Sequence, residues 1–194
     1  MYGHPPVTTA SVGSDGDIHF TGPYNKLFWW PGCVPVDPGS GQDPFLNTFF
    51  PNYADLVTDT SVGACPGCGI FTQTLGTAPN RSFIIRWKAN YFNSPPGPAQ
   101  AEFEVVLTEG SNTLSVIYGV TGDNGLTTVS GIQKDLKMFT SLSCDQATLT
   151  PGPACELPTH RVWRCHADAD AHSHGDAHSD SNTYCYSNSH CNIA

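Results

Sequence analysis

Apolar and polar residues alternate along several short stretches of the chain, most clearly between Phe83 and Phe92. The odd positions of this stretch are Phe83, Ile85, Trp87, Ala89 and Tyr91. The even positions include Arg86, Lys88 and Asn90. Because successive side chains of a strand point to opposite faces, this period of two predicts a strand with one face in a core and the other in water.

A second alternating stretch, Ala101 to Leu107, predicts the partner of a hairpin. Its inward positions are Phe103, Val105 and Leu107, and its outward positions are Glu102 and Glu104. The polar segment from Glu109 to Asn112 then forms a turn. The chain returns as a strand with Leu114, Val116 and Tyr118 on its apolar face.

Weaker strand patterns surround this hairpin, at Ile18 to Phe20, Gly69 to Leu75 and Thr127 to Gln133. Pro- and Gly-rich segments predict loops from Val34 to Pro44 and from Asn93 to Pro98. No long window shows the apolar spacing of a helix. We therefore predict an all-β fold, an antiparallel β-sandwich of jelly-roll-like type.

The amino-acid composition agrees with a fold of strands and turns, and it excludes some classes of binding partner. Charged residues make up only 13 % of the 194, whereas Gly and Pro number 19 and 16. The net charge is −9, and the eight Lys and Arg residues are scattered. Because nucleic-acid binding needs clustered cations, we expect no nucleic-acid partner. No apolar run approaches the length of a membrane span, so we expect none.

The cysteine content indicates an oxidising compartment. Eight cysteines and few charges are typical of an extracellular or cell-surface protein. The segment Met1 to Pro6 has neither the basic nor the apolar region of a signal peptide. We therefore expect that the native N-terminus is missing or was trimmed.

Several short motifs carry a family resemblance. They are Gly69-Ile70-Phe71-Thr72, Ala78-Pro79-Asn80-Arg81-Ser82-Phe83, Trp87, Phe103 to Gly110, Ile117-Tyr118-Gly119 and Gly131-Ile132-Gln133, with Tyr53-Ala54-Asp55-Leu56 upstream. Together they resemble a β-sandwich module of large secreted and cell-surface bacterial proteins, and the hairpin is distantly similar to the nidogen-type extracellular domain. The resemblance runs from about Thr8 to Gly152. It implies an extracellular location and no known catalytic residues.

This resemblance implies a non-catalytic structural or adhesion module whose partners are other extracellular domains or polysaccharide. A carbohydrate-binding module is an alternative, with Trp29, Trp30 and Tyr91 as stacking residues. A further alternative is a subunit that assembles by strand addition, through a sheet edge left open if the last strand is missing after Gly152.

The tail after Gly152 differs in kind from residues 1–152, which we assign to the sandwich domain. From His166 to Asn192 small residues alternate with His, Asp, Asn and Tyr, and His172, His174 and His178 would be the centre of a metal-binding tract. The codons of these four residue types all have A as the second base and a pyrimidine as the third base. Shifted by one base, such codons read as Thr-Pro or Thr-Ala repeats. We therefore interpret residues 153–194 as an out-of-frame Thr/Pro stalk that binds metal only adventitiously and, lacking large apolar residues, is disordered.

The cysteines of the body predict disulfides. Cys65-Pro66-Gly67-Cys68 could be half of a zinc site or a redox motif, but no second ligand pair and no helix accompany it. A disulfide within the turn is the simpler interpretation. Cys33 and Cys144 then form the second bridge, with Cys155 as a competing partner for Cys144.

The acidic residues offer two further site types. Asp55 with Asp59, or Glu102 with Glu104, could be a carboxylate pair for glycoside hydrolysis, but acidic residues two apart on a strand usually form a solvated face. Calcium could bind at Ser14 to Asp17 or at Asp123-Asn124, although turns use the same residues without an ion. We expect neither an enzyme nor a resident cofactor.

Overall fold

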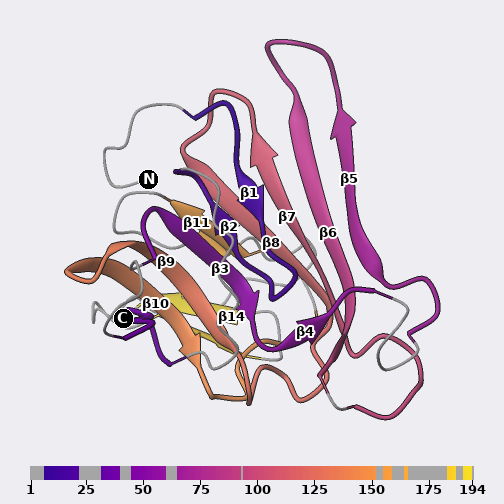
Figure 1. The fold of residues 1–194 in the computed structure, drawn as a ribbon. Helices are drawn as coiled ribbons and strands as arrows, with labels where there is room; N and C mark the ends of the chain where they lie inside the picture. The colour runs from indigo at the N-terminus through magenta and orange to yellow at the C-terminus, as the bar shows by residue number, and fades with distance from the viewer. Residues whose placement is uncertain are drawn as a thin grey trace.

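The computed structural model describes residues 7–21, 32–39, 45–59, 65–92 and 94–151, and further along the chain the strands 155–158, 164–165, 183–186 and 190–193. The described residues form no helix, so none of their segments is a helical membrane span. Two antiparallel sheets pack face to face as a sandwich (Figure 1). This confirms the predicted all-β fold.

The smaller sheet has the strand order β1-β2-β3-β9-β10. These strands are β1 (Ser11–Val12), β2 (Ile18–His19), β3 (Thr48–Tyr53), β9 (Val129–Asp135) and β10 (Met138–Cys144). The chain therefore leaves the smaller sheet after β3, forms strands of the larger sheet, and returns to the smaller sheet at β9.

The larger sheet has the order β12-β11-β8-β7-β6, and β4 and β5 both pair with the remaining edge of β6. These strands are β4 (Leu56–Val57), β5 (Gly69–Leu75), β6 (Ser82–Tyr91), β7 (Ala101–Thr108), β8 (Thr113–Val120), β11 (Cys155–Pro158) and β12 (Arg164–Cys165). The strand β5 and the predicted β7–β8 hairpin are confirmed.

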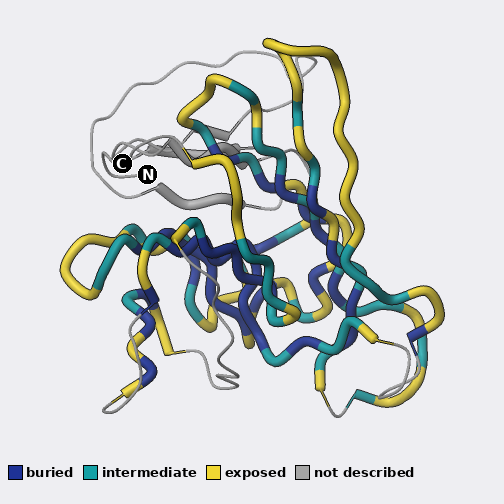
Figure 2. Tube along the Cα trace, turned by 45° about the horizontal axis from the view of Figure 1, so that its top comes forward, coloured by how far each residue is buried: buried dark blue, intermediate teal, exposed yellow. Residues whose placement is uncertain are grey.

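The main core lies between the two sheets (Figure 2). Trp87 of β6 stacks on Phe103 of β7 with ring centroids 4.9 Å apart, and both side chains are fully buried. The indole N–H of Trp87 donates a hydrogen bond to the Gly13 carbonyl at 3.0 Å. Phe49 and Ile132 close this core from the smaller sheet. The alternation in β6 and β7 therefore does face the core as predicted.

Two residues of β6 depart from the predicted alternation. Phe83 is 40 % exposed, because the β5–β6 hairpin projects past the end of the smaller sheet (Figure 1). Asn90, predicted to face water, is buried, and its Oδ1 accepts a hydrogen bond from the Gln100 N–H at 3.1 Å. Hydrophobic pattern alone does not show where one sheet ends over the other.

A second core covers the outer face of the smaller sheet. Residues 32–39, which we call the cover loop, bury Val34 and Val36 against Phe50, Tyr53 and Val129. Phe45 joins this cluster, with its ring centroid 5.2 Å from that of Phe50. Strand β3 is consequently buried along its whole length. The predicted loop over 34–44 is confirmed for 34–39, and its remainder lies outside the described residues.

The chain continues the larger sheet beyond Gly152. Strand β11 pairs with β8, with Leu157 opposite Leu114. The edge that a sandwich ending at Gly152 would leave open is therefore occupied. Further on, β13 (Thr183–Tyr186) and β14 (His190–Ile193) form a two-stranded sheet. The disorder of residues 153–194 and their altered reading frame stay predictions.

Candidate binding surface

Both predicted disulfides are present. Cys65 bonds to Cys68 within the turn that leads into β5, and Cys33 of the cover loop bonds to Cys144 of β10. Cys33 and Cys144 lie beside Asp145 in the one group of three potential metal ligands found among the described residues. Because disulfide-bonded sulfurs have no thiolate to offer, this group is not a metal site.

Most residues of the proposed tail and sugar sites cannot be placed in the fold. His172, His174 and His178 are outside the described residues, as are Trp29 and Trp30.

Tyr91, the third proposed sugar-stacking residue, is half-buried. Its hydroxyl donates a hydrogen bond to the Thr121 carbonyl at 3.4 Å. Burial raises the pKa of Tyr91, and the charge of Asp123 adds to this effect. Tyr91 therefore serves the packing at the end of β6.

The carboxylates proposed as a catalytic pair form a surface ion-pair network. Glu102 and Glu104 lie on the same face of β7, and Arg86 of β6 lies opposite Glu104. An Arg86 Nη atom is 3.0 Å from Glu102 Oε2, and Arg86 Nε is 3.8 Å from Glu104 Oε1. One guanidinium thus contacts both carboxylates, which form a surface ion-pair row on the sheet.

The acidic turn from Ser14 to Asp17 has a structural role. Asp15 Oδ1 accepts a hydrogen bond from the Leu56 N–H at 3.3 Å. Burial, together with the charges of Asp17 and Asp55, raises the pKa of Asp15 to about 7. Burial also raises the pKa of Asp55. This turn therefore fixes the link between β3 and β4.

The other calcium candidate has a similar role. Asp123 Oδ1 accepts hydrogen bonds from the N–H groups of Gly125 and Leu126 at 3.0 and 3.1 Å, and Oδ2 accepts one from the Thr127 hydroxyl at 2.7 Å. Within the described part of the chain, no three carboxylates converge on a common point. In both turns the hydrogen bonds of the carboxylates account for the presence of the acidic residues.

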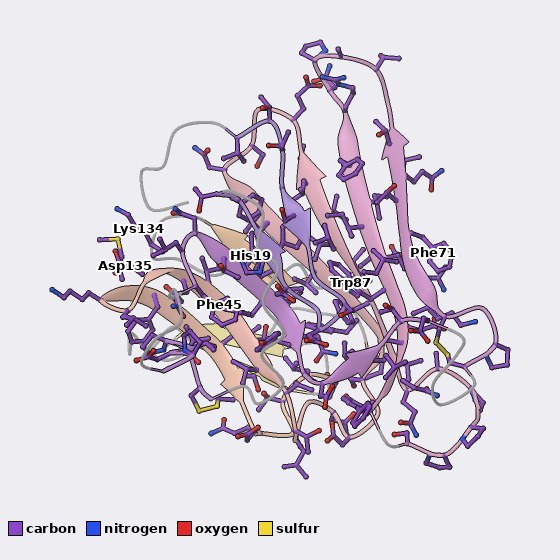
Figure 3. All side chains as sticks on the ribbon, in the orientation of Figure 1. His19, Phe45, Phe71, Trp87, Lys134 and Asp135 are labelled. Atoms are coloured by element: carbon purple, nitrogen blue, oxygen red, sulfur yellow. A yellow bond between two sulfur atoms is a disulfide. The ribbon has the colours of Figure 1, made fainter. Side chains whose placement is uncertain are left out.

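A buried polar row on the smaller sheet could not be recognised in the sequence. His19, Thr48 and Gln133 lie opposite one another on β2, β3 and β9, and all three are buried beneath Phe45 (Figure 3). His19 Nε2 pairs with Asp17, and His19 Nδ1 lies 3.0 Å from the Thr48 hydroxyl oxygen. The Phe45 ring stacks over the imidazole at 5.6 Å. Because no solvent reaches this histidine, its role is structural.

The larger sheet turns apolar side chains outward on the face away from the core. We call this the outer face, and its apolar members are Phe71, Leu75, Ile84, Val106, Ile117 and Val120. Phe71 and Leu75 on β5 are 49 % and 47 % exposed, and Ile117 on β8 is 37 % exposed. Arg86 and Glu104 separate Phe71 from Ile117 in the same cross-strand row.

Such a surface can bind another macromolecule. Exposed apolar groups that gather on one face beside polar ones mark interaction sites more often than isolated ones do. The charged row of Arg86, Glu102 and Glu104 would fix the orientation of a partner, because ion pairs at an interface add specificity more than affinity. This is the strongest candidate site among the described residues.

Comparison with known proteins places the chain in a family. The family model described as "NIDO related" matches residues 1–165. No curated protein and no solved structure matches the chain.

Proposed function

The chain belongs to the NIDO-related family, and on that premise we propose that it is a non-catalytic extracellular or cell-surface module with a structural or adhesive role. The outer face of the larger sheet carries this proposal, because it presents Phe71, Leu75 and Ile117 to solvent on a regular four-strand surface. The expected partners are other extracellular domains or polysaccharide.

The two disulfides support the extracellular assignment. Cys33–Cys144 and Cys65–Cys68 involve every cysteine of the described residues outside β11 to β14. Disulfides persist in oxidising compartments and are rare in a reducing cytosol. A covalently fixed sandwich is also suited to hold a binding face rigid outside the cell.

Adhesion of beads coated with the full chain tests the proposal. The beads are offered surfaces of immobilised neutral and acidic polysaccharide, and a bare surface measures background. We expect the parent chain to bind and the Ile117→Glu variant to lose binding. The new carboxylate lies opposite Glu104, so it adds a second negative charge and bound water to the outer face. A Ser141→Glu variant, at an exposed position of β10 in the smaller sheet, is the matched control and should bind like the parent.

Other outcomes overturn the proposal. Absence of binding to every surface would remove the adhesive role. Binding that depends on Trp29 and Trp30 but not on Ile117 would replace the outer face with a sugar-stacking site. Release of reducing sugar from the polysaccharide would show an enzyme.

A further inference from the structure

Strand β5 differs from the other edges of the two large sheets because none of the usual features that prevent pairing protects it. Its sequence, Gly69 to Leu75, contains no charge and no proline, and it pairs with β6 over seven consecutive residues without a register shift. Native edge strands are usually short, charged, bulged or covered, because an open edge pairs with other chains. Strand β5 is long, neutral and regular.

The remaining edges of the two large sheets each carry one of these protections. Strands β1, β4 and β12 are two residues long. Strand β10 is longer, but two register shifts interrupt its pairing with β9. Bulges of this kind twist an edge and end its pairing. The contrast indicates that the open edge of β5 is a feature of the fold with a use.

We propose that β5 binds the β5 strand of a second copy of this chain, in antiparallel register, to form a dimer. The proposal deepens the structural role given above. The purpose of the dimer rests on that proposed function, whereas its formation does not. A two-fold axis beside Thr72 pairs Thr72 with Thr72, Phe71 with Gln73 and Ile70 with Thr74. All of these pairs are uncharged, and the central Thr–Thr pair is of a favourable kind.

Charge favours a second copy over an acidic or basic partner. The chain has a net charge of −9, so two copies repel wherever their acidic surfaces meet. Because β5 has no ionisable side chain, it lets two copies approach without placing like charges opposite each other. A two-fold contact also closes on itself, so the assembly ends at a dimer.

The position of β5 leaves room for the partner. The β5–β6 hairpin projects beyond the sandwich, and β5 is exposed over most of its length (Figures 1 and 2). Phe71 lies on this strand, far from His19 and Phe45 of the second core (Figure 3). Its ring lies over Gly69, where an added Cβ would come within 3.0 Å of Phe71 Cζ. Pairing would join the outer faces of two copies into one continuous surface.

Sedimentation velocity of the full chain over a concentration series tests this inference. We expect a reversible monomer–dimer equilibrium. A Thr72→Lys variant should weaken dimerisation at least tenfold, because the two-fold axis brings the two ammonium groups together. Thr108→Lys, on a strand with both edges paired, should stay within twofold of the parent. Thermal melting of both variants checks that the fold is intact.

Hydrogen exchange of the unsubstituted chain locates the interface without any variant. Amides of residues 69–75 should gain protection as the protein concentration rises, while those of β10 should not. A chain that stays monomeric, a dimer that Thr72→Lys leaves unchanged, or protection gained at another edge overturns the inference. A monomer that still binds polysaccharide through Ile117 overturns the dimer alone and leaves the proposed function standing.

Discussion

The side-chain amide of Gln133 pairs with the backbone of Val36 as a neighbouring strand would. Gln133 Oε1 accepts a hydrogen bond from the Val36 N–H at 2.7 Å, and Gln133 Nε2 donates to the Val36 carbonyl at 3.1 Å. The same nitrogen donates to the Phe45 carbonyl at 3.0 Å. One buried side chain thus joins the cover loop and Phe45 to strand β9.

Gln133→Ala should therefore destabilise the protein strongly. The substitution leaves three buried backbone groups without partners and opens a cavity beneath the cover loop. Together these effects should lower the free energy of unfolding by about 2–4 kcal/mol. Urea denaturation measures this change. Gln73→Ala, at an exposed position of β5, should cost under about 0.5 kcal/mol, and equal losses in the two variants would contradict the role given to Gln133.

The two disulfides should contribute unequally to stability. Cys33–Cys144 closes a loop with a sequence separation of 111 residues, whereas Cys65–Cys68 spans a separation of 3. Loop entropy of the unfolded chain then gives about 4–5 kcal/mol for the first bridge and about 2 kcal/mol for the second. Paired serine variants compared by urea denaturation test the order. A larger loss for the Cys65→Ser, Cys68→Ser pair would reverse it.

Asp15 should make stability depend on pH. Its folded pKa of about 7 exceeds its ordinary value of 3.8. Between these values the folded chain keeps a proton that the unfolded chain has lost, so stability falls as pH rises from about 4 to 7.

An Asp15→Asn variant removes this effect, because asparagine cannot ionise and keeps an oxygen for the Leu56 N–H. At pH 8 it should be more stable than the parent by about 1–2 kcal/mol, a value reduced for the partial exposure of this side chain. Near pH 4 the two proteins should melt alike. Asp145→Asn, an exposed position with φ of 46°, is the control. A parent whose stability is flat between pH 4 and 7 would disprove the assignment.

The buried pair of His19 and Asp17 should behave as a unit. His19→Ala leaves the Asp17 carboxylate buried without its partner, and breaking such a pair costs about 3–5 kcal/mol. In the double variant with Asp17→Asn the losses should not add, because the second change removes the stranded charge. A thermodynamic cycle measured by denaturation gives the coupling. Additive losses would show that the two side chains act independently.

The sequence alone predicts those strands whose two faces differ. Strands β6 and β7 alternate because their inner side chains meet the core and their outer ones meet solvent. Strand β3 does not alternate, since Phe49 faces the main core while Phe50 faces the second core. A strand buried on both faces lacks the periodic signal from which strands are recognised.

The disulfides and the candidate surface were predictable to different degrees. Few cysteines in the body left Cys33 and Cys144 as a natural pair once Cys65 and Cys68 closed their turn. The outer face was not predictable, because it depends on which strands are neighbours: Phe71 and Ile117 meet in one row only through β6 and β7. Single apolar residues that lie on distant segments of the chain give no local sequence signal of a shared surface.

The bridge between Cys33 and Cys144 also sets how the molecule responds to tension. When the chain is pulled from both ends, force passes directly across this covalent bond. The segment between the two cysteines, which holds β3 to β10 and the outer face, is shielded from the load. Among the described strands, only β1, β2 and β11 to β14 lie outside this segment and can be extended. The outer face, which lies within that shielded segment, therefore keeps its shape while the chain is under tension.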